Sequence, residues 1–221
     1  MKKVDDNFII DTNRKCYDNL GSDYTDGAGD METLQAMGIW QEFLDSLKGR
    51  KVLDVGCGAG DAVQWLAEHG YNVTACDLSQ EMIKVAGQKT DKAKFVVLGA
   101  TEIDNLMEGA FDGIIAIHLV QHLSKGMLKK FFCNVHDLLQ PEGKFLLVFT
   151  NTCYDKTGYQ LDGEKEGNYI FWHKWQMEDI VPILAKAKLK PIVARMQKGM
   201  DKSCAVDMEP FVFICRRADK K

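Results

Sequence analysis

Three features are missing from this 221-residue sequence, and each absence excludes a class of protein. None of its seven cysteines forms a C-x-x-C pair, which argues against a zinc site or a disulfide framework and favours reduced thiols. No stretch of roughly 18 apolar residues is present, so no membrane-spanning helix is expected. The formal net charge is −4, and without a basic excess neither nucleic acid nor an anionic membrane is an expected partner.

The composition that is present fits one globular domain. Apolar residues make up 46% of the chain, enough to bury one sizeable core. We therefore expect a single domain over 1–221, with an N-terminal helical cap over 1–48 and a lid-like insertion over 151–175, because a connection of that length is usually functional or disordered. We expect a cytoplasmic monomer or homodimer that binds no metal.

The apolar pattern alternates between short continuous runs and helical stripes. The runs predict strands buried on both faces, at 51–55, 71–77, 94–98, 111–117 and 144–150, with two closing strands near 190–196 and 209–216. Helical spacing lies between them, and also over 31–48 before the first strand. Strand and helix in repetition indicate βαβ units, hence an α/β fold with a parallel sheet and helices on both faces.

Residues typical of helix caps, turns and helix breaks predict where several elements begin and end. Ser79 is a candidate N-cap, and "QPEG" (140–143) is expected to end a helix and turn the chain into the next strand. Pro182 lies inside a helical pattern over 176–187, where it predicts a kink or break. The segment 17–30 is rich in turn-forming residues.

One motif points to chemistry. "VLDVGCGAG" (52–60) places Gly56, Gly58 and Gly60 after the first strand and before a helix, where open α/β sheets bind ligands. Three alternate glycines exceed what a plain turn needs. They allow a tight turn and would let N–H groups at the helix N-terminus face a polar ligand.

Two ligands compete for this motif. A dinucleotide fingerprint is G-x-G-x-x-G, whereas the spacing here is G-x-G-x-G, with Asp54 two residues ahead. An acid would repel a pyrophosphate, and Asp54 instead suits a ligand with a cationic amino group. Asp77 ends the second strand, where a carboxylate accepts hydrogen bonds from ribose hydroxyls, and it serves either ligand.

Together these motifs resemble the class I S-adenosylmethionine-dependent methyltransferases, in particular the small-molecule branch typified by quinone-biosynthesis enzymes. "VLDVGCGAG" resembles their first motif, "VTACDLSQEMI" (73–83) the acidic motif after strand two, and "FDGIIAIHLVQHL" (111–123) with "LLQPEGKFLLV" (138–148) their fourth and fifth strands. The resemblance spans roughly 40–150. It implies a Rossmann-like three-layer sandwich with a mostly parallel seven-stranded sheet and an antiparallel last strand.

The resemblance also implies a cofactor, S-adenosylmethionine, with S-adenosylhomocysteine as product. One departure is Gly99, which stands where the family usually has an acid for the adenine; Thr101 or Glu102 is a candidate substitute. Cys57 fits between the glycines because it is small, and catalysis is not expected of it. The residues expected at the cofactor are Tyr17, Asp54, Gly56, Cys57, Gly58, Gly60, Asp77, Leu78, Met82, Ala100, Thr101 and Ile117.

The catalytic and substrate candidates are histidines and aromatic residues. His118 ends the fourth strand beside the expected methyl site, so it is the first candidate to accept a proton; a structural histidine there is equally compatible with the sequence. The residues expected at the substrate are Tyr24, His122, Trp172 and His173. For His122 a packing role is favoured over catalysis, and packing explains the aromatic residues about as well as a place at the substrate.

Absent motifs narrow the acceptor to a small molecule. No Asn-Pro-Pro-Tyr-like turn follows the fourth strand, no cysteine follows a proline there, and no basic patch with interleaved aromatic residues occurs. The sequence favours methyl transfer to O, N, S or C by in-line displacement. A nicotinamide-dependent oxidoreductase and a catalytically silent adenosyl-binding protein stay as alternatives.

Overall fold

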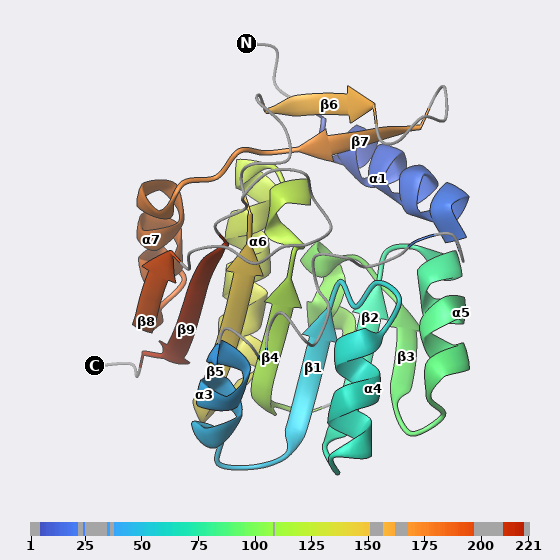
Figure 1. Ribbon diagram of the computed structural model, residues 1–221. Helices are drawn as coiled ribbons and strands as arrows, with labels where there is room; N and C mark the ends of the chain where they lie inside the picture. The colour runs from blue at the N-terminus through green and yellow to red at the C-terminus, as the bar shows by residue number, and fades with distance from the viewer. Residues whose placement is uncertain are drawn as a thin grey trace.

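The computed structural model describes residues 5–21, 24, 35, 38–107, 109–150, 157–161, 168–196 and 210–218. Its centre is a seven-stranded sheet of order β3-β2-β1-β4-β5-β9-β8 (Figure 1). Neighbours from β3 to β5 pair in parallel, whereas β9 is antiparallel to both β5 and β8, which confirms the predicted Rossmann-like α/β class with an antiparallel last strand. The strands are β1 (Lys51–Val55), β2 (Asn72–Asp77), β3 (Lys94–Val97), β4 (Phe111–Ile117), β5 (Leu139–Phe149), β8 (Leu189–Met196) and β9 (Phe211–Arg217).

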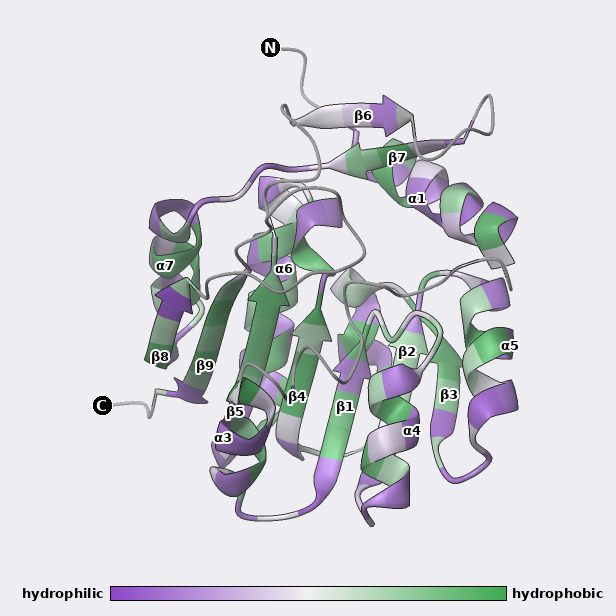
Figure 2. Cartoon of the chain, in the orientation of Figure 1, coloured by the Kyte–Doolittle hydropathy of each residue, from purple (hydrophilic) through white to green (hydrophobic). Residues whose placement is uncertain are grey.

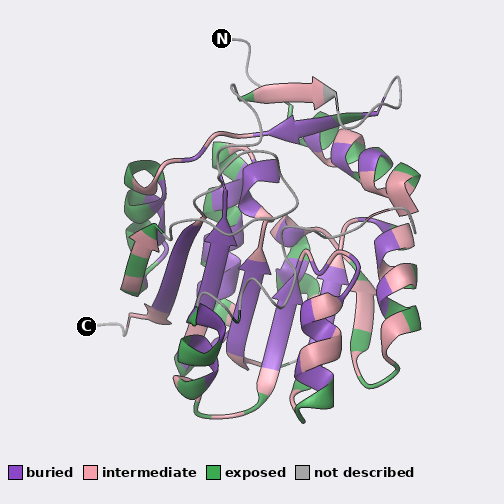
Figure 3. Cartoon of the chain, in the orientation of Figure 1, coloured by how far each residue is buried: buried purple, intermediate pink, exposed green. Residues whose placement is uncertain are grey.

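Helices cover both faces of the sheet. The central strands are buried and apolar along most of their length (Figures 2 and 3), because each face packs against helices. α3 and α4 pack on one face, and α6 and α7 pack on the other. The helices are α1 (Asp6–Leu20), α3 (Ile39–Asp45), α4 (Asp61–Glu68), α5 (Gln80–Lys89), α6 (Lys125–Leu138) and α7 (Met177–Lys186), with 3-10 turns η2 (Ala100–Asn105) and η3 (Val120–His122). No helix of the described residues is long and apolar enough to cross a bilayer.

The strand order reverses at one point. From β1 the chain moves outward to β2 and β3, and it then returns to β4 on the other side of β1. The connections leaving β1 and β4 therefore diverge at the carboxyl ends of these two strands. A crevice forms at such a switch point, and it is the usual place for a ligand in an open parallel sheet.

A helix and a hairpin whose bounds the sequence did not predict lie over this edge, within the segments expected as cap and lid. α1 packs against the hairpin formed by β6 (Gly158–Leu161) and β7 (Tyr169–Trp172), and both lie above the carboxyl ends of the strands in Figure 1. The buried stripe of α1 contains a polar residue, Asn13, between Ile9 and Cys16, so an apolar periodicity does not reveal it. Residues 17–20, predicted as part of a turn-rich segment, complete this helix.

The helix predicted over 31–48 is shorter than expected where it is described. α3 begins at Ile39, and the apolar positions Leu34 and Met37 lie outside the described residues. Trp40, Phe43 and Leu44 are buried against the sheet as the spacing predicts.

The helix predicted before 140–143 does end there, since α6 ends at Leu138, but the turn predicted at 140–143 is wrong. β5 begins at Leu139 directly after α6, and the "QPEG" segment lies inside the strand. The pairing of β4 with β5 shifts between Phe111↔Leu139 and Gly113↔Lys144, so the extra residues are accommodated as an irregularity in the ladder. Gln140, Pro141 and Glu142 are exposed there and need no ladder partner.

The break predicted at Pro182 is also wrong. α7 continues through Pro182, whose missing N–H leaves the carbonyl of Glu178 without its helical donor. Both residues are exposed, so water can satisfy that carbonyl. A capping box formed by Gln176 and Asp179 stabilises the first turn.

Gly60 marks the closest approach of α4 to α5. It is the N-cap of α4 with a φ of 85°, and a Cβ built on it would lie 2.6 Å from the Cβ of Ala86. The residue therefore meets two structural demands, a left-handed backbone and a close helix–helix contact. It does not line the cavity described below, which differs from its expected place at the cofactor.

We predict that Gly60→Ala lowers the free energy of unfolding by roughly 2–4 kcal/mol, through the left-handed backbone and the clash with Ala86. The matched control is Gly87→Ala on the same helix as Ala86, where a Cβ would meet nothing within 4 Å. That change should raise stability by about 0.5–1 kcal/mol, because alanine is the better helix former. Urea unfolding measures both, and equal stability of the two variants would contradict this account of Gly60.

Candidate active site

A cavity opens at the switch point and gathers most of the predicted site residues. Its walls come from α1, the loop after β1, the ends of β2, β3 and β4, and η3. The predicted residues that line it are Tyr17, Tyr24, Gly56, Gly58, Asp77, Leu78, Ala100, Thr101, Ile117, His118 and His122. The predicted residues that do not line it are Asp54, Cys57, Gly60, Met82, Trp172 and His173.

The glycine loop after β1 uses several of its N–H groups within the protein, and the expectation that N–H groups at the start of α4 face a ligand stays a prediction. The N–H groups of Gly56 and Cys57 donate to the carbonyl of Cys76 at 2.8 and 3.0 Å, and that of Gly60 donates to the carbonyl of Cys57. Gly56 and Gly58 have φ values of 74° and 50°, which L side chains rarely adopt. The carbonyl oxygens of this loop can accept from a cationic amino group.

Asp77, at the end of β2, ties the glycine loop to α5. Its Oδ2 accepts from the Gly58 N–H at 3.0 Å and its Oδ1 accepts from the Ser79 N–H at 2.9 Å. Burial raises the pKa of the Asp77 carboxyl, and these two backbone bonds oppose that rise. Each oxygen still has capacity for a second donor, so the carboxylate can hold a diol.

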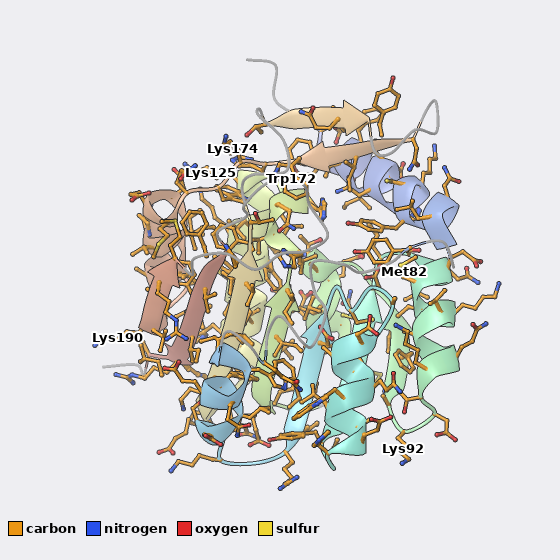
Figure 4. All side chains as sticks on the ribbon, in the orientation of Figure 1. Met82, Lys92, Lys125, Trp172, Lys174 and Lys190 are labelled. Carbon is orange, nitrogen blue, oxygen red and sulfur yellow. The ribbon has the colours of Figure 1, made fainter. Side chains whose placement is uncertain are left out.

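Ser79 is the N-cap of α5, as predicted. Its Oγ accepts from the Met82 N–H at 3.1 Å and donates to Asp18 Oδ1 on α1 at 2.5 Å. The cap residue therefore joins α1 to the helix that follows Asp77. Met82 itself is fully buried in α5, behind the cavity wall (Figure 4).

The third wall follows β3. Leu98, Gly99, Ala100 and Thr101 line the cavity beside Leu78, and they present an apolar surface with one hydroxyl. A Cβ on Gly99 would lie 3.2 Å from Oε2 of Glu102, so the carboxylate of Glu102 stands close to the place that the acid usually occupies. Whether Thr101 or Glu102 replaces that acid stays a prediction.

His118 and Ile117 lie at the mouth of β4. The His118 N–H donates to the carbonyl of Val148 on β5 at 2.8 Å, which extends the sheet pairing by one residue. Its φ is 52°, a left-handed value that is uncommon for a residue other than glycine and that costs energy. This backbone turns the chain away from the sheet into η3.

His122 is buried between α1 and β7. Its Nε2 lies 2.9 Å from the Tyr17 hydroxyl, and its Nδ1 lies 3.1 Å from the carbonyl oxygen of Phe171. Asn13, four residues before Tyr17, donates from Nδ2 to the His122 carbonyl at 3.2 Å and accepts at Oδ1 from the Phe171 N–H at 2.7 Å. Sequence reasoning missed Asn13, whose only signal is that it lies one helical turn from Tyr17.

Trp172 and His173 lie behind this network. Trp172 packs edge-on against the ring of His122 at 5.3 Å, and Figure 4 shows it on β7 above the sheet. The N–H of His173 donates to the carbonyl of Gln121 at 2.6 Å, and its ring stacks on Trp175 at 3.6 Å. Burial lowers the pKa of His173. Tyr24, by contrast, lines the cavity edge-on to Tyr17 at 5.6 Å.

Two of the predicted cofactor residues that lie outside the cavity, the acid Asp54 and the thiol Cys57, are buried. Asp54 lies within β1 and is 3% exposed. Burial, with the nearby carboxylates of Asp77 and Asp54, raises the pKa of the Cys57 thiol well above its usual value. A thiol held protonated is a poor nucleophile, so catalysis is not expected of Cys57. Its small side chain fits between the two glycines of the loop.

Comparisons with known proteins agree with this geometry. The family model described as "Methyltransferase domain" matches residues 53–147. The ubiquinone biosynthesis O-methyltransferase of Coxiella burnetii is 28% identical over 162 residues, which cover 70% of this chain and 67% of that protein.

Solved structures share the fold. The 1,6-didemethyltoxoflavin-N1-methyltransferase of Burkholderia thailandensis superposes with a TM-score of 0.75 at 18% identity, covering 99% of this chain and 93% of that one. A S-adenosylmethionine-dependent methyltransferase of Clostridium acetobutylicum gives 0.70 at 18% identity, covering 92% and 100%. At these identities the likeness concerns the fold.

We predict that a thiol reagent applied to the native protein modifies Cys133, which is exposed, and leaves Cys57, Cys76 and Cys215 unmodified. Burial keeps these three thiols protonated and out of reach. Peptide mass spectrometry after brief labelling makes the comparison, with urea-unfolded protein as the control in which all sites react. Rapid native labelling of Cys57 would contradict the structural role given to it.

Proposed function

The chain belongs to the class I S-adenosylmethionine-dependent methyltransferases, and on that premise we propose that its acceptor is the hydroxyl oxygen of a small, uncharged molecule. The chain is an enzyme that transfers a methyl group to a small-molecule acceptor. The nicotinamide-dependent and catalytically silent alternatives are thereby set aside. The choice of oxygen is supported by the O-methyltransferase activity in the names of its relatives.

S-adenosylmethionine is consumed in this reaction and supplies a methyl group already activated on a sulfonium. The residues of one side of the cavity fit it. Gly56 and Gly58 present a backbone without side chains, and their loop offers acceptors to an amino group. Asp77 would hold the ribose hydroxyls. Leu78, with Ala100 and Thr101, would enclose the adenine.

The other side of the same cavity would hold the acceptor. We assign to that side the rings of Tyr17, Tyr24, His118 and His122, together with Ile10 and Met127, all of which line the cavity. Tyr17, which the sequence placed at the cofactor, is thereby proposed at the acceptor. Among the described lining residues no lysine or arginine occurs, so a carboxylate or phosphate on the acceptor would find no cationic partner. The observation that carries the proposal is this union of Asp77, the glycine loop and an aromatic wall in one cavity.

The reaction depends chiefly on how the acceptor is positioned relative to the methyl group. In-line displacement needs the acceptor oxygen about 3 Å from the methyl carbon, aligned with the bond that breaks, and shielded from water. Ile117 and His118 line the cavity, and they would stand between its two halves, where the methyl would cross. α1 and the β6–β7 hairpin, our proposed cap and lid, would exclude water. Trp172 and His173 would support this wall from behind rather than touch the acceptor.

We also propose that the enzyme works in the cytoplasm as a monomer or homodimer, without nucleic acid. The described cysteines are free thiols, which a reducing compartment would preserve. A chain of negative net charge has no general attraction for a polyanion.

We predict that Asp77→Asn weakens binding of S-adenosylmethionine and S-adenosylhomocysteine by about 10- to 100-fold, because a charge-assisted hydrogen bond contributes more than a neutral one. For the unchanged protein, affinity should fall as the pH drops through the raised pKa of Asp77, since only the carboxylate accepts from both ribose hydroxyls. Asp77→Asn should lose that fall. Isothermal titration calorimetry across a pH series measures both.

The matched control is Asp112→Asn. Asp112 is the second residue of β4, far from the carboxyl ends of the strands, and its Oδ2 accepts from the Lys51 N–H at 3.0 Å. Its substitution should leave affinity within a few-fold. Transfer of labelled methyl to catechol and other small hydroxyl compounds then tests the acceptor class. Failure to bind either adenosyl compound, or stabilisation by NAD alone, would refute the proposed function.

A further inference from the structure

Four hydrogen bonds close a network around His122. Asn13 joins the His122 carbonyl to the Phe171 N–H, the Phe171 carbonyl contacts His122 Nδ1, and Tyr17 contacts His122 Nε2. The members come from α1, η3 and β7, and contact partners are separated by as many as 158 residues. Asn13 and His122 are buried, whereas Tyr17 is partly buried and lines the cavity.

This arrangement fixes which nitrogen of His122 carries the proton. A carbonyl oxygen can only accept, so Nδ1, 3.1 Å from the Phe171 carbonyl, carries the hydrogen. In the neutral ring Nε2 is then an acceptor, and the Tyr17 hydroxyl, 2.9 Å away, donates to it. Tyr17 Oη keeps lone pairs that can accept a proton from a molecule in the cavity.

We propose that Tyr17 and His122 relay the proton of the acceptor hydroxyl away from the reaction, and that Asn13 positions the pair. This inference rests on the proposed transfer to oxygen. It replaces the direct role predicted for His118, whose part is then to line the wall where the methyl crosses.

The relay balances as follows. The acceptor oxygen forms a bond to the methyl carbon while the carbon–sulfur bond breaks, and sulfur keeps that electron pair in S-adenosylhomocysteine. The acceptor proton moves to Tyr17 Oη as the Tyr17 proton moves to His122 Nε2, which leaves a neutral tyrosine and an imidazolium. After the products leave, the proton returns through the same two atoms to water.

Asn13 acts through the other two residues. Its amide holds the backbone of His122 and the backbone of Phe171, the residue whose carbonyl sets the tautomer. The amide orientation is itself determined, because one neighbour accepts and the other donates. Loss of Asn13 would leave both backbone groups buried without these partners and would free the imidazole to turn.

The first experiment observes the tautomer directly and needs no acceptor. Long-range ¹H–¹⁵N correlation spectra of histidine-labelled protein, bound to S-adenosylhomocysteine, report which nitrogen is protonated, and His122→Asn assigns the signal. We expect His122 to be protonated at Nδ1 alone. Tyr17→Phe should shift the Nε2 resonance, and Asn13→Ala should produce a mixture of tautomers. A single Nε2–H tautomer in the unchanged protein would overturn the proposal.

The second experiment uses the ionisation of the acceptor. Catechol must lose a proton during transfer, whereas 4-nitrocatechol is already largely ionised at neutral pH. Tyr17→Phe should lower kcat on catechol by about 10²–10⁴-fold, the usual contribution of a general base, and lower it far less on 4-nitrocatechol. His118→Gln should leave the ratio of the two rates unchanged. Asn13→Ala should lower kcat on catechol while KM for S-adenosylmethionine stays within a few-fold.

Tyr159→Phe is the matched control. Tyr159 packs edge-on against Phe171 from the hairpin, at 5.4 Å between ring centroids, and it lies outside the cavity. Its substitution removes a hydroxyl near the same backbone but not from the relay, so the rate ratio should not change. A ratio altered by His118→Gln and not by Tyr17→Phe would overturn the relay. Weak adenosyl binding by the unchanged protein would refute the proposed function instead. If neither catechol is methylated, the tautomer of His122 measured in the first experiment is the test of the relay.

Discussion

The Asp77 carboxylate is the contact on which the cofactor half of this site depends. It accepts one N–H from the glycine loop after β1 and one from the start of α5, so it fixes the ends of two neighbouring strands at one point. Burial of the Asp77 carboxylate is electrostatically unfavourable, and for that reason the pKa of this group is raised. A carboxylate kept in such a place at that cost is typical of a binding site. Ser79 extends the contact to Asp18, and through it to α1.

The cap is therefore attached to the sheet at two separate places. Near its end, α1 contacts Ser79 through Asp18; it contacts η3 through the adjacent Tyr17, and both η3 and β7 through Asn13, one turn earlier. Both attachments use polar groups, and a polar contact has a narrower range of acceptable geometry than an apolar one. These hydrogen bonds therefore restrict the position of α1, which lines the cavity, and this suits an enzyme whose catalysis is mostly positioning.

Sequence reasoning succeeded where the signal is local. The strand runs, the Ser79 cap and the glycine loop each depend on residues a few positions apart, and β1 and β4 begin and end where predicted. It failed where the role of a residue depends on contacts with residues far away in the sequence. Gly60 matches a cofactor motif, but its neighbour is Ala86 on another helix. The stripe of α1 contains Asn13, whose partners lie 109 and 158 residues away, so nothing nearby in the sequence explains a buried amide.

The distinction between local and long-range contacts also separates the two proposed parts of the site, the adenosyl side and the acceptor side. Most of the residues proposed to hold the adenosyl compound come from two consecutive βα connections, so one short stretch of sequence carries most of that half. The residues around the acceptor come from α1, the end of β4, η3 and, through Phe171, the hairpin, and only tertiary contacts bring them together. A chain can alter the second set without disturbing the first. On this proposal, α1 and its hydrogen bonds to His122 select the acceptor, and the sheet beneath supplies the place where the methyl is offered.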